Sequence, residues 1–394
     1  MALGQPLGSL VDEALRTNRE ILAAQKKYEA ARQRPAQAGA LPDPTVSLGY
    51  TSSGGPWPGA GIGSTPTSNA GLMISQEMPF PGKRQLRSEI ASKEADAEFQ
   101  QYLAVRLDVV GRLKQAYHEL HHAEASIAFV QRYQDLLRNM LRIAEARYSV
   151  GRAAQQDIFK IQTQFSIFQA QLLRYQQERT AKEIEINALL NRRQGGPIDI
   201  PAEMETGVIP ATLDEMLEHA RAHSPMIAGQ QKLVQRDELA ANLARKGYLP
   251  DYTISAGYFN QGSMPPMWQA RVDVKLPGFF GRKLHAAVTE QEFTAGEARH
   301  NYEAADISIE ARIREEYTLA ETARKLIDLY QKSAIPEAQL ALESSMAAYE
   351  TGKLDFLAVF SNFMNVVDYE LMYHEEIMQF HVALARLEGM GATE

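Results

Sequence analysis

The chain repeats itself, and this internal duplication constrains its fold more than any single motif. Leu41–Tyr50 reads LPDPTVSLGY, and Leu249–Tyr258 in the second half reads LPDYTISAGY. Two further pairs follow in the same order: PFPGKR at Pro79–Arg84 with LPGFFGRK at Leu276–Lys283, and YSVG at Tyr148–Gly151 with YETG at Tyr349–Gly352. Solenoid units are about 20 to 50 residues long, so this longer period predicts two large repeats, 1–200 and 201–394, that form one functional unit.

Each repeat is expected to contain a helical segment, two strands and two long helices. The first repeat places them at Leu7–Gly39, at about 45–51 and 71–78, and at about 82–150 and 153–191. The second places them at Leu213–Lys246, at about 252–259 and 268–276, and at about 281–350 and 354–388. The Gly/Pro-rich loop Thr51–Ala70 is expected to be the least ordered stretch.

The helices are unusually long, because no proline occurs between Gly82 and Gly196. At about 1.5 Å per residue, a first helix of roughly 65 residues extends for roughly 100 Å, which exceeds an ordinary globular domain. Apolar residues in it recur three, four or seven positions apart, as a coiled-coil seam requires: Leu113, Tyr117, Leu120, Ile127, Val130, Leu137 and Leu141. In the second repeat Pro336 interrupts the pattern and is expected to kink its helix.

Composition excludes several classes of protein. The chain has no cysteine, which removes disulfides, cysteine metal sites and thiol catalysis. Its net charge of −8 argues against a nucleic-acid partner. No run of about 18 apolar residues predicts a membrane-spanning helix, and the first residues, MALGQPLGSL, do not have the pattern of a signal peptide. No cofactor is expected.

The strands alternate polar and apolar residues, most regularly in WQARVDVKL at Trp268–Leu276. Such alternation is typical of a strand with one face in lipid and one in water. We therefore expect a lipid-facing set, Val46, Leu48, Trp268, Val272 and Val274, and a lumen-facing set, Gln269, Arg271, Asp273 and Lys275. The alternative is a soluble sheet that packs its apolar face on a core. Four strands cannot close a barrel, so in a membrane several chains must share one. Two copies would supply eight strands and three would supply twelve, and the polar inner face favours the wider barrel.

A possible zinc motif lies in the middle of the first long helix. His118, Glu119 and His122 form the H-E-x-x-H pattern that in metalloproteases supplies two zinc ligands and a general base. A hydrolase also needs a third ligand and a substrate cleft, and a continuous helix carries the following acidic residues along the rod instead of back over the metal. We therefore expect no metal site and no enzyme. A zinc hydrolase and a soluble coiled-coil scaffold remain as alternative functions.

Taken together, these features resemble the TolC-like family of outer-membrane efflux channels. The segments that carry the resemblance are SQEMPFPGKRQLR at Ser75–Arg87, ARYSVGRAAQQD at Ala146–Asp157 and AAYETGKLDF at Ala347–Phe356. The resemblance implies an α+β membrane protein of a Gram-negative bacterium, with four strands per chain in a twelve-stranded trimeric β-barrel in the outer membrane. It also implies a periplasmic α-barrel of coiled-coil helices, with the linker Arg192–Thr212 in a belt around it.

The function implied by the resemblance is a passive exit duct of a tripartite efflux system. Such a homotrimer contacts outer-membrane lipid, and its helical tips dock a periplasmic adaptor protein that connects it to an inner-membrane pump. The PFPGKR turn favours heavy-metal ions as cargo, because it is similar to that branch of the family. Drug efflux and type I protein secretion are the alternatives.

The resemblance also assigns roles to residues at the helical tips. The adaptor-docking residues would be Val150, Gly151, Arg152, Thr351, Gly352 and Lys353. Asp157 and Tyr349 would close the resting tip by a hydrogen bond across two coiled coils. Glycine C-caps, and a local bond from Asp157 to its own backbone, are the simpler interpretations.

Overall fold

The computed structural model describes residues 7–53, 55–193, 195–201 and 206–393. Expectations that fall on 1–6, on Gly54 of the loop, or on Gln194 and 202–205 of the linker lie outside these residues. The chain divides into a helical unit, made of Met1–Ala24, Tyr102–Pro225 and Asp306–Glu394, and a sheet unit, made of Gln25–Gln101 and Met226–Ala305. Each unit combines segments of both sequence repeats, so the units do not coincide with 1–200 and 201–394.

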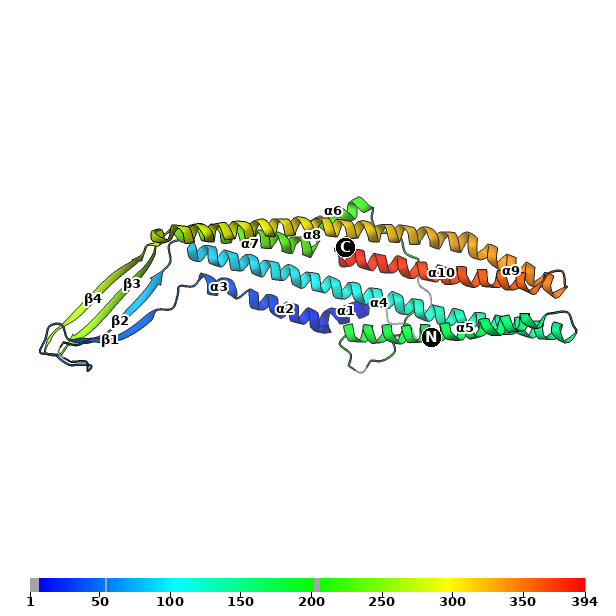
Figure 1. The fold of residues 1–394 in the computed structure, drawn as a ribbon, viewed down its shortest axis with the longest axis horizontal. Coiled ribbons are helices and arrows are strands. Elements are labelled where there is room, and N and C mark those ends of the chain that lie inside the picture. Colours follow the sequence, from blue (N-terminus) through cyan, green and yellow to red (C-terminus); the bar gives the residue numbers. More distant parts are fainter. Residues whose placement is uncertain (1–6, 54, 194, 202–205, 394) are drawn as a thin grey trace. The chain divides into compact units, whose positions relative to one another are not determined.

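The sheet unit is built on one antiparallel sheet with the strand order β1-β2-β3-β4 (Figure 1). The strands are β1 at Thr45–Thr51, β2 at Asn69–Met78, β3 at Asp251–Gln261 and β4 at Met264–Lys275. The register places Leu48 opposite Leu72, Leu72 opposite Tyr258, and Tyr258 opposite Trp268. The alternating apolar side chains of all four strands therefore lie on one face of the sheet.

Three strands are longer than the sequence predicted, and β4 begins four residues before the expected Trp268. A two-residue turn joins β3 to β4, with Gly262 at φ +71° and the Asn260 side chain accepting a hydrogen bond from its N–H at 2.7 Å. Pro265 and Pro266 concealed the start of β4 from sequence reasoning, since proline cannot donate to a sheet. They are tolerated because they lie at the start of β4, beside the register shift between Phe259 and Gln261.

The loop between β1 and β2, expected to be the least ordered stretch, is held by side-chain hydrogen bonds. Ser68 Oγ accepts from the Ser53 backbone N–H at 3.0 Å and from Thr65 Oγ1 at 2.6 Å. The loop also reaches the turn after β3, where Ser263 Oγ donates to the Gly63 carbonyl at 3.0 Å. Serine and threonine side chains therefore hold this loop in place by hydrogen bonds, whereas apolar packing does so elsewhere in the chain.

A buried lysine joins the two repeats where β2 turns into the first long helix. Lys83, only 6% exposed, donates to the Leu249 carbonyl at 2.8 Å and to Asp251 Oδ1 at 2.9 Å. The same carboxylate oxygen accepts from the Phe80 N–H at 2.7 Å. The basic turn of the first repeat thus pairs with the LPD motif of the second.

The remaining elements are helical. The sheet unit also contains α3 at Arg34–Gly39, a short 3₁₀ turn at Lys246–Tyr248 and another at Pro277–Phe280. Helices that lie in the helical unit, or begin or end in it, are α1 at Leu7–Thr17, α2 at Arg19–Ala31, α4 at Lys83–Ser149, α5 at Gln155–Leu189, α6 at Leu213–His223, α7 at Pro225–Arg245, α8 at Gly281–Leu329, α9 at Ile335–Glu350 and α10 at Phe356–Gly389. Within the described residues no helix is both long enough and apolar enough to span a bilayer.

The helical segment that opens each repeat is interrupted for an identifiable reason. Between α1 and α2, the side chain of Asn18 accepts from the N–H groups of Glu20 and Ile21 at 2.8 and 3.1 Å, which caps the new helix. Between α6 and α7, Pro225 begins the second helix, because proline suits the first helical turn and disfavours helical geometry in the residue before it.

The kink expected at Pro336 takes the form of a π-helical turn. This π segment, Tyr330–Ala334, separates α8 from α9 and ends two residues before the proline. Proline cannot donate a backbone hydrogen bond, and its ring collides with the carbonyl one turn earlier in a regular α-helix. The wider π turn changes that register and removes the conflict.

Apolar packing in the helical unit follows the predicted seam. Leu113, Leu120, Val130 and Leu137 of α4 are at most 1% exposed. The largest cluster joins α4, α5, α9 and α10, which run alongside one another in Figure 1. Its fully buried aromatic members are Phe168 of α5 and Phe363 of α10. A second cluster joins α1 and α2 to α4 and the end of α5.

Candidate functional site

The two helical turns named by sequence analysis have the same backbone geometry. Gly151 has φ +72° and Gly352 has φ +77°, a left-handed conformation that glycine adopts without steric cost. In the first turn the Arg152 N–H donates to the Arg147 carbonyl at 2.8 Å, and in the second the Lys353 N–H donates to the Ala348 carbonyl at 2.9 Å. Both turns are therefore Schellman caps, which accounts for the glycines as structural requirements.

Around these caps the side chains are open to solvent. Val150 is 66% exposed, and Arg152, Thr351 and Lys353 are exposed as well. An apolar valine and two cations are thus exposed together at these two turns. The structure places all six proposed docking residues at these two turns.

Asp157 makes the local hydrogen bond to the backbone that was the simpler of its two interpretations. It is the third residue of α5, and its Oδ2 accepts from the Ala154 N–H at 3.3 Å. Its negative charge also acts on Tyr349, helping burial to raise the pKa of that phenol. Tyr349 is 7% exposed, and its hydroxyl has no hydrogen-bond partner among the described residues. Within one chain, then, the two side chains are electrostatic neighbours without a hydrogen bond between them.

Arg147 is the residue at this tip that sequence reasoning missed. Its guanidinium lies 4.2 Å from the centroid of the Tyr349 ring and also donates to the Tyr349 carbonyl. Cation–π contacts of this kind contribute roughly 0.5 to 2 kcal/mol. The contact links the C-terminal turn of α4 to that of α9. The repeated segments YSVG and YETG in the sequence do not reveal that these two turns are in contact.

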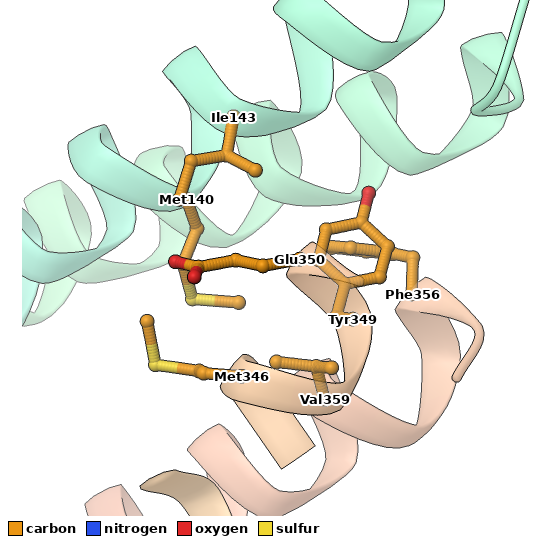
Figure 2. A pocket seen from close by; sticks show the side chains of 7 residues that line it. All are labelled: Met140, Ile143, Met346, Tyr349, Glu350, Phe356 and Val359. Carbon is orange, nitrogen blue, oxygen red and sulfur yellow. The ribbon is translucent and has the colours of Figure 1, made fainter. Parts of the chain in front are cut away.

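A pocket lies against the second turn, lined by α4, α9 and α10. Figure 2 shows Met140 and Ile143 of α4 on one side of this pocket and Met346 and Val359 on the other. Tyr349 and Phe356 lie at one end, and Glu350 completes the lining. The rings of Tyr349 and Phe356 meet at 6.1 Å with an interplanar angle of 63°. The lining is mostly apolar and includes two methionines, whose flexible side chains fit irregular gaps between helices.

The histidines of the H-E-x-x-H motif are buried in the packing between helices. The His118 ring stacks on His381 of α10, with centroids 4.6 Å apart and an interplanar angle of 10°. Parallel stacked rings cannot direct their nitrogens at one ion. Burial lowers the pKa of His118 from 6.5 to about 3, and His381 acts in the same direction. Among the described residues, no group of three or more acidic or imidazole side chains is placed to hold a metal ion.

The sheet leaves its apolar face open in the isolated chain. The lipid-facing residues predicted from sequence are 47% to 83% exposed: Val46, Leu48, Trp268, Val272 and Val274. On the opposite face Arg271 pairs with Asp273 at 2.9 Å, and Lys275 lies 3.8 Å from Glu77. Gln269 is opposite Gly257 in the register. A soluble sheet would bury the apolar face on a core, and this one does not.

Comparison with known proteins agrees with this arrangement. Residues 10–192 and 216–374 match the model of the outer membrane efflux protein family. The chain is 23% identical to outer membrane protein TolC of Vibrio cholerae serotype O1 over 305 residues. This alignment covers 72% of this chain and 67% of that protein.

Solved structures show the same fold. VceC of Vibrio cholerae superposes with a TM-score of 0.81 at 19% identity, covering 98% of this chain and 96% of that one. The open state of the MtrE channel of Neisseria gonorrhoeae superposes with a TM-score of 0.79 at 18% identity, covering 98% and 88%. Four strands and a set of long helices per chain are therefore confirmed as the fold. The chain belongs to the outer membrane efflux protein family, and as predicted it is an outer-membrane protein of Gram-negative bacteria and a channel protein, not an enzyme.

Proposed function

We propose that this chain assembles as a homotrimer into a passive exit duct of a tripartite efflux system. The observation that carries the proposal is an open four-stranded sheet whose apolar face is exposed. In lipid, unpaired strand edges are not tolerated, so β1 of one chain must pair with β4 of another until the sheet closes. Three chains supply twelve strands to that barrel.

Charge on the other face supports three chains over two. Arg271, Asp273 and Lys275 project from one strand, and Glu77 of β2 joins them. An eight-stranded barrel has an interior just wide enough for side chains to fill, which leaves no water for these charges. A twelve-stranded barrel provides a solvated lumen, and the same water provides the path for cargo.

The helices provide a second reason for assembly. Exposed apolar residues recur along the outside of α5 and of α8–α9: Phe159, Leu173 and Ile184 on the first, and Phe293, Ile307, Leu329 and Leu340 on the second, each between 54% and 76% exposed. Positions of this kind are normally covered by another helix. We propose that neighbouring subunits cover them and that the covered helices form the periplasmic α-barrel.

At the tips, the exposed turns are proposed to dock the periplasmic adaptor, which connects the duct to an inner-membrane pump. The Tyr349 hydroxyl, which is buried and has no hydrogen-bond partner among the residues that the structure describes, supports a closing bond to an acidic group of a neighbouring subunit. Asp157 is the proposed acceptor, since its carboxylate already makes only one weak backbone bond of 3.3 Å.

For cargo, the PFPGKR turn supports heavy-metal ions, with drugs and secreted proteins as the alternatives. The described part of the chain contains no cluster of three or more acidic or imidazole side chains placed to hold an ion, and we propose that the pump selects the cargo. Crosslinking the channel in cells and identifying the adaptor and pump that co-purify distinguishes the three.

The barrel is tested by placing one aspartate on either face of the same strand. Val272→Asp puts a charge on the proposed lipid face, which is destabilising near the bilayer centre, though by less than the roughly 2 to 4 kcal/mol that an arginine or lysine costs there. Gln269→Asp puts the same charge in the proposed lumen. We expect Val272→Asp to abolish folded trimer in outer-membrane fractions and Gln269→Asp to preserve trimer and bilayer conductance. Equal tolerance of both, or a water-soluble monomer without detergent, would refute the channel.

A further inference from the structure

A glutamate interrupts the apolar seam of α10. Phe356, Phe363, Glu370 and Ile377 lie seven residues apart, and their exposed fractions are 4%, 0%, 7% and 8%. In coiled coils, a single polar residue in such a seam is a recognised way to specify one register over others, at a cost in stability. Glu370 is therefore placed where a register is chosen.

Three other side chains meet the Glu370 carboxylate from two different helices. Tyr133 of α4 and Gln339 of α9 donate to its Oε1, both at 2.9 Å, and Arg132 of α4 donates to its Oε2. Arg132 is itself held over the rings of Phe129 and Tyr133, at 5.5 and 5.1 Å. The carboxylate thus connects the α4/α5 pair with the α9/α10 pair through directional bonds.

The π segment lies at the same level of the helical unit. Its first residue, Tyr330, donates a hydrogen bond to Met372 Sδ at 3.4 Å, and its ring lies 6.2 Å from Tyr369. Both contacts flank Glu370 on α10. Pro336 and Gln339 follow the segment within one turn or two of α9. A π turn is a weak point of a helix, because its hydrogen-bond register is already altered.

We propose that the π segment is a hinge for the α9/α10 pair and that Glu370 is the latch that holds this pair on α4. This inference rests on the proposed function, because it concerns the motion of the tip of an exit duct. Apolar contacts between the pairs are non-directional and allow one pair to slide on the other. The bonds of Glu370 exist in one register only, so they select the present arrangement.

The test uses the absence of cysteine from the chain. Val150→Cys and Lys353→Cys place one nitroxide label at the turn of each pair, and an excess of co-expressed cysteine-free chain makes label pairs between chains rare. Double electron–electron resonance on the detergent-purified protein then measures the label-to-label distance within one chain. Glu370→Gln removes the charge but retains the shape. Glu343→Gln on the exposed face of α9 is the control for the loss of one charge.

We expect one distance population for the parent and for Glu343→Gln. Glu370→Gln should raise the ratio of displaced to present arrangements by about tenfold or more, the effect of weakening hydrogen bonds to a charged group. Tyr133→Phe should move the same ratio in the same direction by less. Unchanged distances in Glu370→Gln, in protein that is folded by circular dichroism, would overturn the latch. Loss of trimer or conductance in the parent would instead count against the proposed function.

Discussion

Acid should destabilise the helical unit through the buried histidines of α4, and His118 gives the largest calculable effect. Its ring is 9% exposed, and its pKa is about 3 in the folded chain against 6.5 as its ordinary value. Between these two pKa values the His118 side chain is protonated in the unfolded chain and neutral in the folded chain. The contribution of His118 to the free energy of unfolding is therefore fully present above pH 6.5 and decreases as the pH falls towards 3. Between pH 7 and pH 5 this one group costs about 2 kcal/mol.

The perturbation is His118→Phe, which keeps an aromatic ring against His381 but cannot take up a proton. Tyr117→Phe is the matched control, since it alters the same turn of α4 at another buried ring without removing a histidine. The assay is the free energy of unfolding from guanidinium titrations, followed by circular dichroism in detergent at both pH values. We compare the difference between pH 7 and pH 5 within each variant, so a constant packing cost cancels.

The parent and Tyr117→Phe should lose at least about 2 kcal/mol on going from pH 7 to pH 5, and His118→Phe should lose about 2 kcal/mol less. Some acid sensitivity should remain in His118→Phe, because burial also lowers the pKa of His122 and of His374. If His118→Phe has the same pH dependence as the parent, the ring is not buried in neutral form and the packing described for it is wrong.

Three further outcomes follow from other parts of the chain. Gly352→Ala should cost about 1 kcal/mol of unfolding free energy, because φ +77° is strained for alanine although the site has room, and hydrogen exchange should increase at that turn only. Lys83→Met should cost about 2 to 3 kcal/mol in the same guanidinium assay, because Asp251 loses its ionic partner and keeps only the bond from the Phe80 N–H. Lys83→Met combined with Asp251→Asn should recover part of that loss. Arg192 donates to Glu13 at 2.7 and 2.5 Å, and these bonds lower the pKa of Glu13. The parent should therefore be more stable to unfolding than Glu13→Gln at neutral pH, by less than about 1 kcal/mol. This difference should disappear as the pH falls below 4.5.

Local chemistry explains what could be predicted from sequence. Strand alternation at Val272 and Val274 has period two, and a left-handed cap such as Gly151 needs glycine whatever surrounds it. Features of this kind are encoded within a few residues. The number of strands, the paired long helices and the two turns could therefore be predicted before any coordinates were known, and so could the family.

Contacts between distant segments explain what could not be predicted. The Arg147–Tyr349 stack joins residues 202 positions apart, and the Tyr133–Glu370 bond joins residues 237 positions apart. One signal of the second was present, because Glu370 falls on the heptad of Phe363 and Ile377, where an apolar residue is expected. The early start of β4 was concealed by Pro265, which is accommodated because the register of β3 and β4 shifts at that point.

The H-E-x-x-H letters show why a motif needs its surroundings. In an isolated helix, His118 and His122 are one turn apart and lie on one face, which is the geometry a zinc site requires. The neighbouring helix decides the outcome: α10 presents His381 to the first ring, and Glu375 lies 3.7 Å from the second. Each ring is thus engaged with a different partner, and the imidazoles act as part of the core. Burial disfavours the protonated form of an imidazole, so protonation of these rings destabilises the folded chain. The same motif that suggests catalysis therefore predicts sensitivity to acid.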